Sequence, residues 1–196
     1  MARSGVAEGV GPALVRRVVD EAAALARRKA APVSWREGRA EALPFPDVSF
    51  NLVYSVDVVH HVQDRRAFIG EALRALADRG WFLTVTDSEE IIRRRVPLSK
   101  YFPETVEAEL RRYPKAGEIP QLLRDAGFRE ISEEVVEFAY ELSDSAAFER
   151  KAFSSLHLIS DEAFARGLAR LKQDLLKGPI GCNSKYVIYR GRKARE

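Results

Sequence analysis

The fold of this chain is decided by the segment Asn51-Leu-Val-Tyr-Ser-Val56 and the later segment Trp81-Phe-Leu-Thr-Val-Thr86. Both are short and almost entirely apolar, which is typical of strands covered on both faces in a parallel sheet. Between them, residues 64–77 carry apolar side chains at helical spacing, with Asp64 as an N-cap and Gly80 as the helix stop. This order of strand, helix and strand predicts a βαβ unit, whose right-handed crossover joins two parallel strands.

The residues that follow this unit predict a helical cover and the rest of the sheet. Residues 89–126 form several short helical stretches separated by prolines, and the last of them ends at Gly127. Two further strands and two further helices are expected at 128–141, 185–190, 143–156 and 160–176. The whole chain, residues 1–196, is expected to form a single α/β domain with an open sheet and helical cover elements at 89–126 and 143–176.

The composition argues against several classes of protein. The 196 residues include 32 basic and 29 acidic side chains, for a formal net charge of +3. The single cysteine, Cys182, excludes an internal disulfide framework and a zinc site built from cysteines. No apolar run is long enough to span a bilayer and no secretory segment is seen, so a cytoplasmic location is expected. The arginines at 93–95 are more typical of a solvated helix face than of a nucleic-acid patch.

Several stretches match one family when they are taken together. They are Gly38-Arg-Ala-Glu-Ala-Leu-Pro-Phe-Pro-Asp47, then residues 49–64, 74–86 and 123–128, the last ending in Ala-Gly-Phe. Together they resemble the small-molecule class I S-adenosylmethionine-dependent methyltransferases, the broad group that includes the ubiquinone and menaquinone enzymes. The resemblance covers roughly residues 18–130. It implies a Rossmann-like open sheet, S-adenosylmethionine as cofactor and a small-molecule methyl acceptor, with no membrane partner.

The resemblance also implies where the cofactor binds, because ligands of such sheets lie across the carboxyl ends of the strands. In the family an acidic side chain often takes the adenine amino group, and the next backbone N–H meets the ring. These positions are Arg39 and Ala40 here. Arginine has no hydrogen-bond acceptor, so the contact that remains is a backbone one from Ala40 or Glu41, while Arg39 could equally point to solvent. Ser55 and Val56 would lie beneath the methionine part of the cofactor.

The glycine-rich loop that the family carries upstream is degenerate in this chain. In the family this loop follows a strand and precedes a helix and a second strand, which ends in the acid that binds the ribose. Only Gly5-Val-Ala-Glu-Gly-Val-Gly11 fits the loop here, so Gly9 and Gly11 would cradle the cofactor and Asp20 would bind the ribose. Only eight residues separate Gly11 from Asp20, too few for a helix and a strand.

Three interpretations of the N-terminus stay open. The chain is truncated relative to the parent fold, or its first βαβ unit has eroded, or residues 1–17 form a compressed loop that still binds the cofactor. We favour loss or compression of the first βα unit, with residues 12–30 as one helix and Asp20 facing solvent. Such a loss would leave the strand at 51–56 with an unpaired apolar edge, which predicts a homodimer or domain swapping across that edge unless another segment covers it.

The segment Asp57-Val-Val-His-His61 is the best candidate for catalysis. Asp57 and His61 share a face if the turn is helical, and the carboxylate would then orient the imidazole and raise its pKa. A similar Asp-x-x-x-His serves as a base in the phosphoethanolamine methyltransferases, a resemblance that implies His61 as base and Asp57 as its partner. The other interpretation is that both histidines are structural. His60 is expected in packing and His157 in a structural role, and no metal site is predicted.

The predicted function is methyl transfer from S-adenosylmethionine to a small molecule. The alternative is a catalytically inactive methyltransferase-like protein that acts by binding or as a partner subunit. A nucleic-acid methyltransferase would need a contiguous basic groove, which the charge pattern does not favour. In the cover, Tyr101, Phe102 and Tyr113 could line an acceptor pocket, but we expect them to form the cover's own core.

Overall fold

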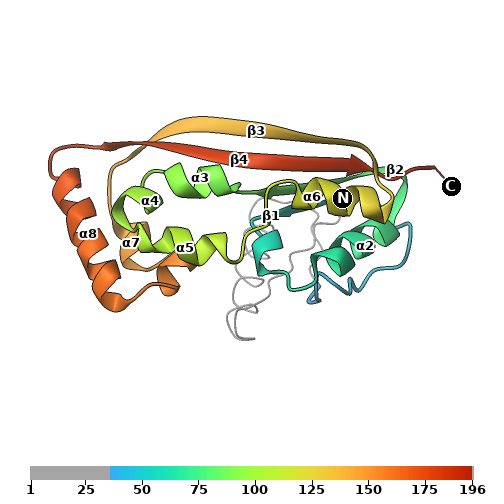
Figure 1. Ribbon diagram of the computed structural model, residues 1–196, viewed down its shortest axis with the longest axis horizontal. Helices are drawn as coiled ribbons and strands as arrows, with labels where there is room; N and C mark the ends of the chain where they lie inside the picture. The colour runs from blue at the N-terminus through green and yellow to red at the C-terminus, as the bar shows by residue number, and fades with distance from the viewer. Residues whose placement is uncertain (1–35, 196) are drawn as a thin grey trace, which may run out of the picture. The chain divides into compact units, whose positions relative to one another are not determined.

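The computed structural model describes residues 36–195 (Figure 1). The helix expected at 12–30 lies outside this part of the chain. Within it, no helix combines the length and the apolar character that crossing a membrane requires.

The described residues contain one mixed sheet. Its strands are β1 (Phe50–Val56), β2 (Leu76–Thr86), β3 (Arg129–Leu142) and β4 (Ile180–Arg192). They are hydrogen-bonded in the order β1-β2-β4-β3, so β1 and β3 form the two edges among the described residues. The open α/β architecture predicted from the sequence is therefore confirmed.

The strands β1 and β2 are parallel, as the βαβ pattern predicts. A Cβ atom on Gly80 of β2 would lie 3.2 Å from the carbonyl oxygen of Asn51 at the start of β1. Four residues further along both strands, the Ser55 hydroxyl donates a 2.7 Å hydrogen bond to the Thr84 hydroxyl. The residue numbers rise together, which defines the parallel register.

The strands β3 and β4 are antiparallel. Arg190 of β4 donates a 2.7 Å hydrogen bond to Ser132 of β3, and Arg192 pairs with Glu130 at 3.0 Å. The residue numbers fall in one strand as they rise in the other. Two long antiparallel strands beside a parallel pair make the sheet mixed, an arrangement common in α/β folds.

One predicted boundary is wrong. The helix α2 (Arg65–Ala75) ends before Gly80, and β2 begins directly at Leu76. Asp64 is the N-cap, as predicted, and accepts a 2.9 Å hydrogen bond from the Ala67 amide. Gly80 lies inside the strand, where a Cβ atom would come within 2.8 Å of the Ala77 carbonyl oxygen. Close backbone approach, rather than a helix end, requires glycine at this position.

Contacts divide the molecule into two compact units. The first unit contains the described residues up to Thr84, together with Pro120–Ser132 and the chain from Tyr189 onward. The second unit contains Val85–Ile119 and Glu133–Ile188.

The first unit is held together by aromatic packing between α2, β2 and the start of β3. Phe82 is fully buried, with its ring centroid 5.7 Å from Phe68 and 5.8 Å from Phe128. The helix α6 (Glu118–Ala126) ends at Gly127, which has a φ of 102°. The helix and its glycine stop were both predicted, and both are confirmed.

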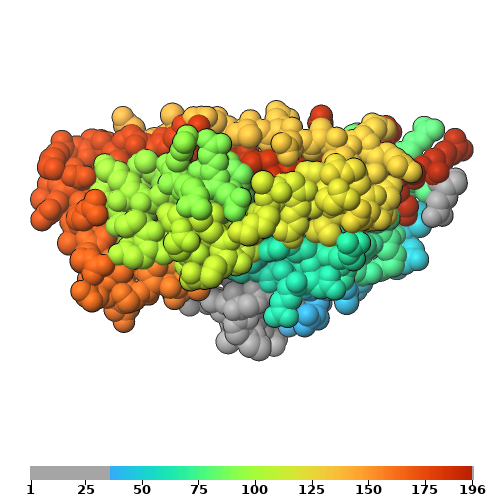
Figure 2. Space-filling model, in the orientation of Figure 1, coloured from blue at the N-terminus to red at the C-terminus, as the bar shows by residue number. Residues whose placement is uncertain are grey.

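The second unit is mainly helical. Its helices are α3 (Glu89–Arg94), α4 (Leu98–Tyr101), α5 (Glu104–Leu110), α7 (Ala146–Glu149) and α8 (Asp161–Leu175), with a 3-10 turn, η2, at Ser154–His157. The proline-separated helices and the long helix near 160–176 are confirmed. Figure 2 shows the surface of α3 and α5 in green, and beneath it Ile92, Leu110 and Tyr113 form a small core.

The helix predicted over 143–156 is wrong. Its first turn, α7, is stopped by Lys151, which has a φ of 48°. The Ala152 amide donates to the Ala147 carbonyl and the Lys151 amide donates to the Phe148 carbonyl, which is the Schellman arrangement of a helix C-terminus. A lysine rarely takes the left-handed conformation of this stop, so the sequence carries no signal for it.

The larger core of the second unit contains the other two cover aromatics besides Tyr113. Tyr101 and Phe102 are buried together with Phe148, Leu156 and Leu171. The expectation that the tyrosines and the phenylalanine of the cover form its own core, rather than an open pocket, is therefore confirmed.

The packing of α8 on α4 depends on Gly167. A Cβ atom at this position would lie 2.5 Å from the Tyr101 carbonyl oxygen and would overlap the Phe102 ring. We expect Gly167→Ala to lower the free energy of unfolding by about 1–3 kcal/mol, because backbone atoms must move to relieve the overlap. Thermal or urea unfolding measures this loss.

The same substitution in α2 is the matched control. Gly70 is exposed and has nothing within 4 Å of its Cβ position, so Gly70→Ala is expected to stabilise the protein by about 0.5–1 kcal/mol. Equal effects at the two glycines would contradict the packing of α8 on α4.

The acid Asp174 of α8 gives a pH-dependent stability. Lys177 and Tyr101 each donate a 2.8 Å hydrogen bond to it, and these bonds lower its pKa from 3.8 to about 2. A depressed folded-state pKa contributes stability above the unfolded value, and that contribution is lost as the pH falls through the folded one. The stability difference between the wild type and Asp174→Asn should therefore be constant above about pH 5 and vanish below about pH 2. Thermal unfolding across this range tests it, and a pH-independent difference would contradict the pairing.

Candidate functional site

The carboxyl end of β1 turns abruptly in the first unit. Ser55 is buried and its hydroxyl is engaged by Thr84, whereas Val56 is half exposed. Asp57 follows with a φ of 53°, in the left-handed region that few residues other than glycine adopt. A non-glycine residue held in this conformation at the end of a strand is often part of a functional turn.

The histidines follow this turn in the 3-10 helix η1 (Val59–His61). The His60 side chain is buried, as expected, and His61 is partly exposed, with the ring centroids 4.1 Å apart. Asp57 lies before η1 rather than within a helical turn. The helical spacing that would place Asp57 and His61 on one face is therefore not formed, although both side chains stay at the same strand end.

The loop at 38–42 is the second part of the candidate site. The Ala42 amide donates a 3.1 Å hydrogen bond to the Arg39 carbonyl, closing a tight turn around Ala40, which is buried. Gly38 is required beside this turn, since a Cβ atom there would lie 2.6 Å from Pro44. The Arg39 side chain is 65% exposed, in keeping with the interpretation that it points to solvent.

Glu41 is the residue of this loop whose side chain sequence reasoning missed. Its side chain is 9% exposed, and both carboxylate oxygens are buried without a hydrogen-bond donor among the described residues. The Arg39 guanidinium, 3.9 Å away, is its nearest cation among the ion pairs of the described residues. Because buried carboxylates nearly always have donors, Glu41 has acceptor capacity that a ligand could fill. Sequence alone suggested only the backbone of Glu41.

The loop is fixed to α2 by one arginine. Arg74 donates to the carbonyl oxygens of Leu43 and Phe45 and pairs with Asp47 at 2.6 Å. It also pairs with Glu71 at 2.8 Å, and Glu71 in turn accepts a 2.7 Å hydrogen bond from the Leu43 amide. The Arg74 hydrogen bond lowers the pKa of Glu71, so the carboxylate stays ionised. The clamp holds the loop in one conformation.

The second unit contains a buried ion cluster. Arg95 pairs with both Asp87, directly after β2, and Glu109 of α5. Arg112 pairs with Glu109 at 3.2 Å. Arg95 is only 16% exposed, so the expectation of a solvated arginine face is wrong for it. That expectation is confirmed for Arg93 and Arg94, which are more than half exposed.

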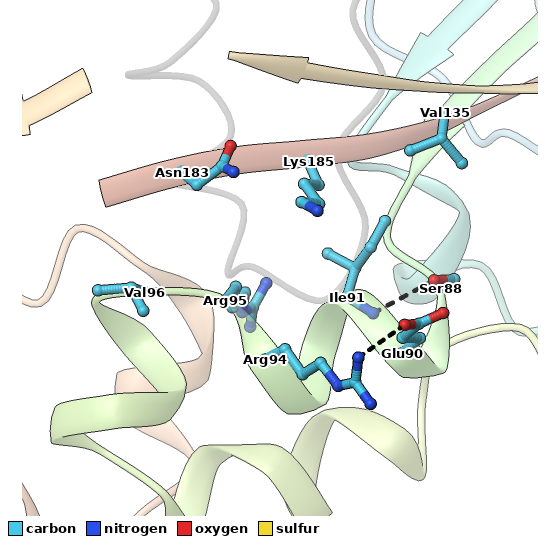
Figure 3. Close-up of a pocket in the computed structure, with 9 residues that line it drawn as sticks. All are labelled: Ser88, Glu90, Ile91, Arg94, Arg95, Val96, Val135, Asn183 and Lys185. Atoms are coloured by element: carbon cyan, nitrogen blue, oxygen red, sulfur yellow. Dashed lines mark hydrogen bonds and ion pairs between the residues drawn. The ribbon is translucent and has the colours of Figure 1, made fainter. Parts of the chain in front are cut away.

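A pocket of about 350 Å³ adjoins this cluster in the second unit (Figure 3). It is lined by residues of α3 and of the chain on either side of it, and by side chains of β3 and β4. None of the cover aromatics lines it. The pocket was not predicted, because its walls come from segments nearly a hundred residues apart.

The remaining predicted residues do not join either site. Gly9, Gly11 and Asp20 lie outside the described residues. His157 is exposed, and its Nε2 lies 2.9 Å from the Lys151 carbonyl oxygen. Across residues 36–195, no group of three or more histidine, cysteine or acidic side chains is placed to hold a metal ion.

Comparison with known proteins agrees with this arrangement. Residues 1–84 match the model of the methyltransferase domain family. A probable S-adenosylmethionine-dependent methyltransferase of Mycolicibacterium smegmatis is 32% identical over 136 residues, which are 64% of this chain and 50% of that protein. The ubiquinone/menaquinone biosynthesis C-methyltransferase UbiE of Shewanella halifaxensis is 28% identical over 118 residues, covering 51% of this chain and 47% of that protein.

A solved structure supports the fold. A putative methyltransferase from Bacillus halodurans superposes with a TM-score of 0.63 at 17% identity, covering 99% of this chain and 84% of that one. The chain spans about half the length of the two curated relatives. Residues 1–84 therefore resemble the methyltransferase domain family, and the sheet has the fold of a solved methyltransferase structure.

Proposed function

We propose that the protein transfers a methyl group from S-adenosylmethionine to a small-molecule acceptor. The proposal is carried by two features of the first unit: a clamped loop with a buried hydrogen-bond acceptor, and a parallel strand that ends in a histidine turn. Ligands of α/β sheets bind at such strand ends. The sulfonium supplies an already activated methyl carbon, so the protein mainly has to bind and align the two reactants.

Glu41 fits the adenine end of this cofactor. The exocyclic amino group of adenine is a hydrogen-bond donor, and the Glu41 carboxylate has buried oxygens that lack one. The arginine at position 39 cannot serve as an acceptor. We therefore assign to Glu41 the acceptor role that Arg39 cannot fill, with the Ala40 backbone beside the ring. Ser55 and Val56 would support the methionine part, while Gly9, Gly11 and Asp20 remain proposals for its carboxylate and ribose.

Titration calorimetry with S-adenosylhomocysteine tests the proposal. We expect measurable binding to the full chain and an affinity about ten-fold lower for Glu41→Ala, the loss of one hydrogen bond to a charged group. Glu37→Ala is the matched control, since Glu37 is an exposed acid four residues away, and it should bind like the wild type. If S-adenosylhomocysteine does not bind at near-millimolar concentration, the enzyme proposal is rejected. The result would favour the alternative, a catalytically inactive methyltransferase-like protein that binds a partner.

His61 is proposed as the general base and Asp57 as the residue that orients it. A base is useful when the acceptor atom is a hydroxyl or a protonated amine, because the proton must leave as the methyl group arrives. The partial exposure of His61 at the strand end leaves its ring accessible to an acceptor.

A homodimer through β1 is also proposed. Among the described residues β1 is an edge strand, and Leu52, Tyr54 and Val56 on one of its faces are each between 44% and 50% exposed. Apolar side chains on an edge strand favour association with a second copy. Sedimentation velocity should show a concentration-dependent dimer that Leu52→Lys weakens. A strictly monomeric wild type would contradict the dimer without touching the proposed activity.

A further inference from the structure

We propose that the pocket of the second unit binds a small organic anion, a carboxylate or phosphate ester with an apolar body. Its volume of about 350 Å³ lies within the usual range for small-molecule sites. Binding of an anion by this pocket does not rest on the proposed function.

The charge of the pocket walls is positive. Among the described residues, the charged side chains that line it are Arg94, Arg95, Lys185 and one acid, Glu90. Glu90 is neutralised by Arg94, four residues along α3, at 3.1 Å. The two remaining charges on the lining, Arg95 and Lys185, are both cationic.

The acids that hold these two cations lie outside the pocket lining. Arg95 is fixed by Asp87 and Glu109, and Lys185 of β4 pairs with Glu137 of β3 at 2.8 Å. These carboxylates offset the charge of the two cations, but among the described residues the lining contains the cationic hydrogen-bond donors and not these three acids. Figure 3 shows the Lys185 side chain extending from β4 toward α3, beside which Arg95 lies.

The rest of the lining is apolar or neutral. Ile91, Val96 and Val135 contribute hydrocarbon surface, and Val135 is 61% exposed. Two cations beside hydrocarbon surface suit an amphipathic ligand, whose anionic oxygens meet Arg95 and Lys185 while its apolar part covers the valines. An arginine held by two acids is pre-organised for such oxygens, since its planar donors are already ordered.

The test compares three probes of one shape: benzoate, phenyl phosphate and the neutral benzamide. Each is titrated into the isotopically labelled full chain without S-adenosylhomocysteine, at constant ionic strength, and followed by NMR chemical shifts. We expect benzoate or phenyl phosphate to shift amides of α3 and β4 and to bind at least ten-fold more tightly than benzamide. The tighter of the two anions identifies the ligand as a carboxylate or as a phosphate.

The variant Lys185→Gln should weaken binding of that anion about five-fold, the loss expected of one partly exposed charge. The matched control is Lys172→Gln, because Lys172 pairs with Glu149 at 2.7 Å and with similar exposure, away from the pocket. Equal affinities for benzoate and benzamide, or equal effects of the two lysine variants, would overturn the proposal. If the protein binds the anion but not S-adenosylhomocysteine, the pocket proposal stands and the methyltransferase proposal is rejected. If it binds S-adenosylhomocysteine but neither anion, the methyltransferase proposal stands and the pocket proposal is rejected.

Discussion

Replacing Glu109 by glutamine is expected to lower the free energy of unfolding by about 3–5 kcal/mol. Glu109 is 3% exposed and pairs with two arginines, Arg95 and Arg112. Burial lowers the pKa of Arg112, and the positive charge of nearby Arg95 lowers it further. The two guanidinium groups therefore need the negative charge of Glu109 between them to stay stable in their charged form. Without its charge, Arg95 keeps its ion pair with Asp87, and Arg112 loses its ion pair with Glu109. Urea unfolding measures the loss.

The control lies two residues away on the same helix. Glu107 pairs with Arg93 at 3.6 Å, but its side chain is 72% exposed. Because surface ion pairs contribute little, Glu107→Gln should change the free energy of unfolding by less than about 1 kcal/mol. If the two glutamate variants unfold alike, the ion cluster is not the stabilising element that we describe.

Loss of the His61 imidazole should have the largest effect on activity. For His61→Ala we expect kcat to fall about 10²-fold to 10⁴-fold, the range typical of a removed general base. Affinity for S-adenosylhomocysteine should stay unchanged, and the acidic limb of the pH–rate profile, which reports protonation of the base, should disappear. The measurement is S-adenosylhomocysteine release with an acceptor that the wild type turns over.

The exposed His157 is the control for this experiment. Its only hydrogen bond recorded in the described residues is to a backbone carbonyl, so His157→Ala should leave kcat and its pH profile intact. A purely structural role for His61 predicts another pattern, in which thermal stability and cofactor affinity fall together and the acidic limb remains. That pattern would contradict the proposed role of His61 as general base, but it would not contradict the methyltransferase proposal.

Much of the first unit could be predicted from the sequence, because its signals are local. The apolar run at 51–56, the N-cap Asp64 and the glycine stop at Gly127 each act through neighbouring residues. A parallel register then follows, since a strand, a helix and a strand can be joined in few ways. The helix stop at Lys151 has the same hydrogen-bond pattern as the one at Gly127. It was missed because lysine, unlike glycine, is not a residue from which a positive φ is predicted.

The candidate site was predictable only in part. The strand end with Asp57 and His61, and the loop at 39–41, follow from motif positions. The solvent-facing Arg39 and the buried Glu41 could not be told apart, because both are charged residues in one short loop. Burial of a carboxylate depends on what packs around it, and the clamp that shapes this loop comes from Arg74, more than thirty positions along the chain.

The sequence by itself determined the order of strands and helices, the parallel βαβ unit and the resemblance to the methyltransferases. Only the tertiary structure showed that Arg95, unlike its neighbours in the arginine run, is mostly buried and pairs with Asp87 and Glu109. Only the tertiary structure showed that Lys185 lines the same pocket as Arg95. The physical reason is the distance over which each kind of interaction acts. Hydrophobic periodicity and capping act within a few residues, whereas ion pairing and burial depend on distances in space that only the packed chain fixes.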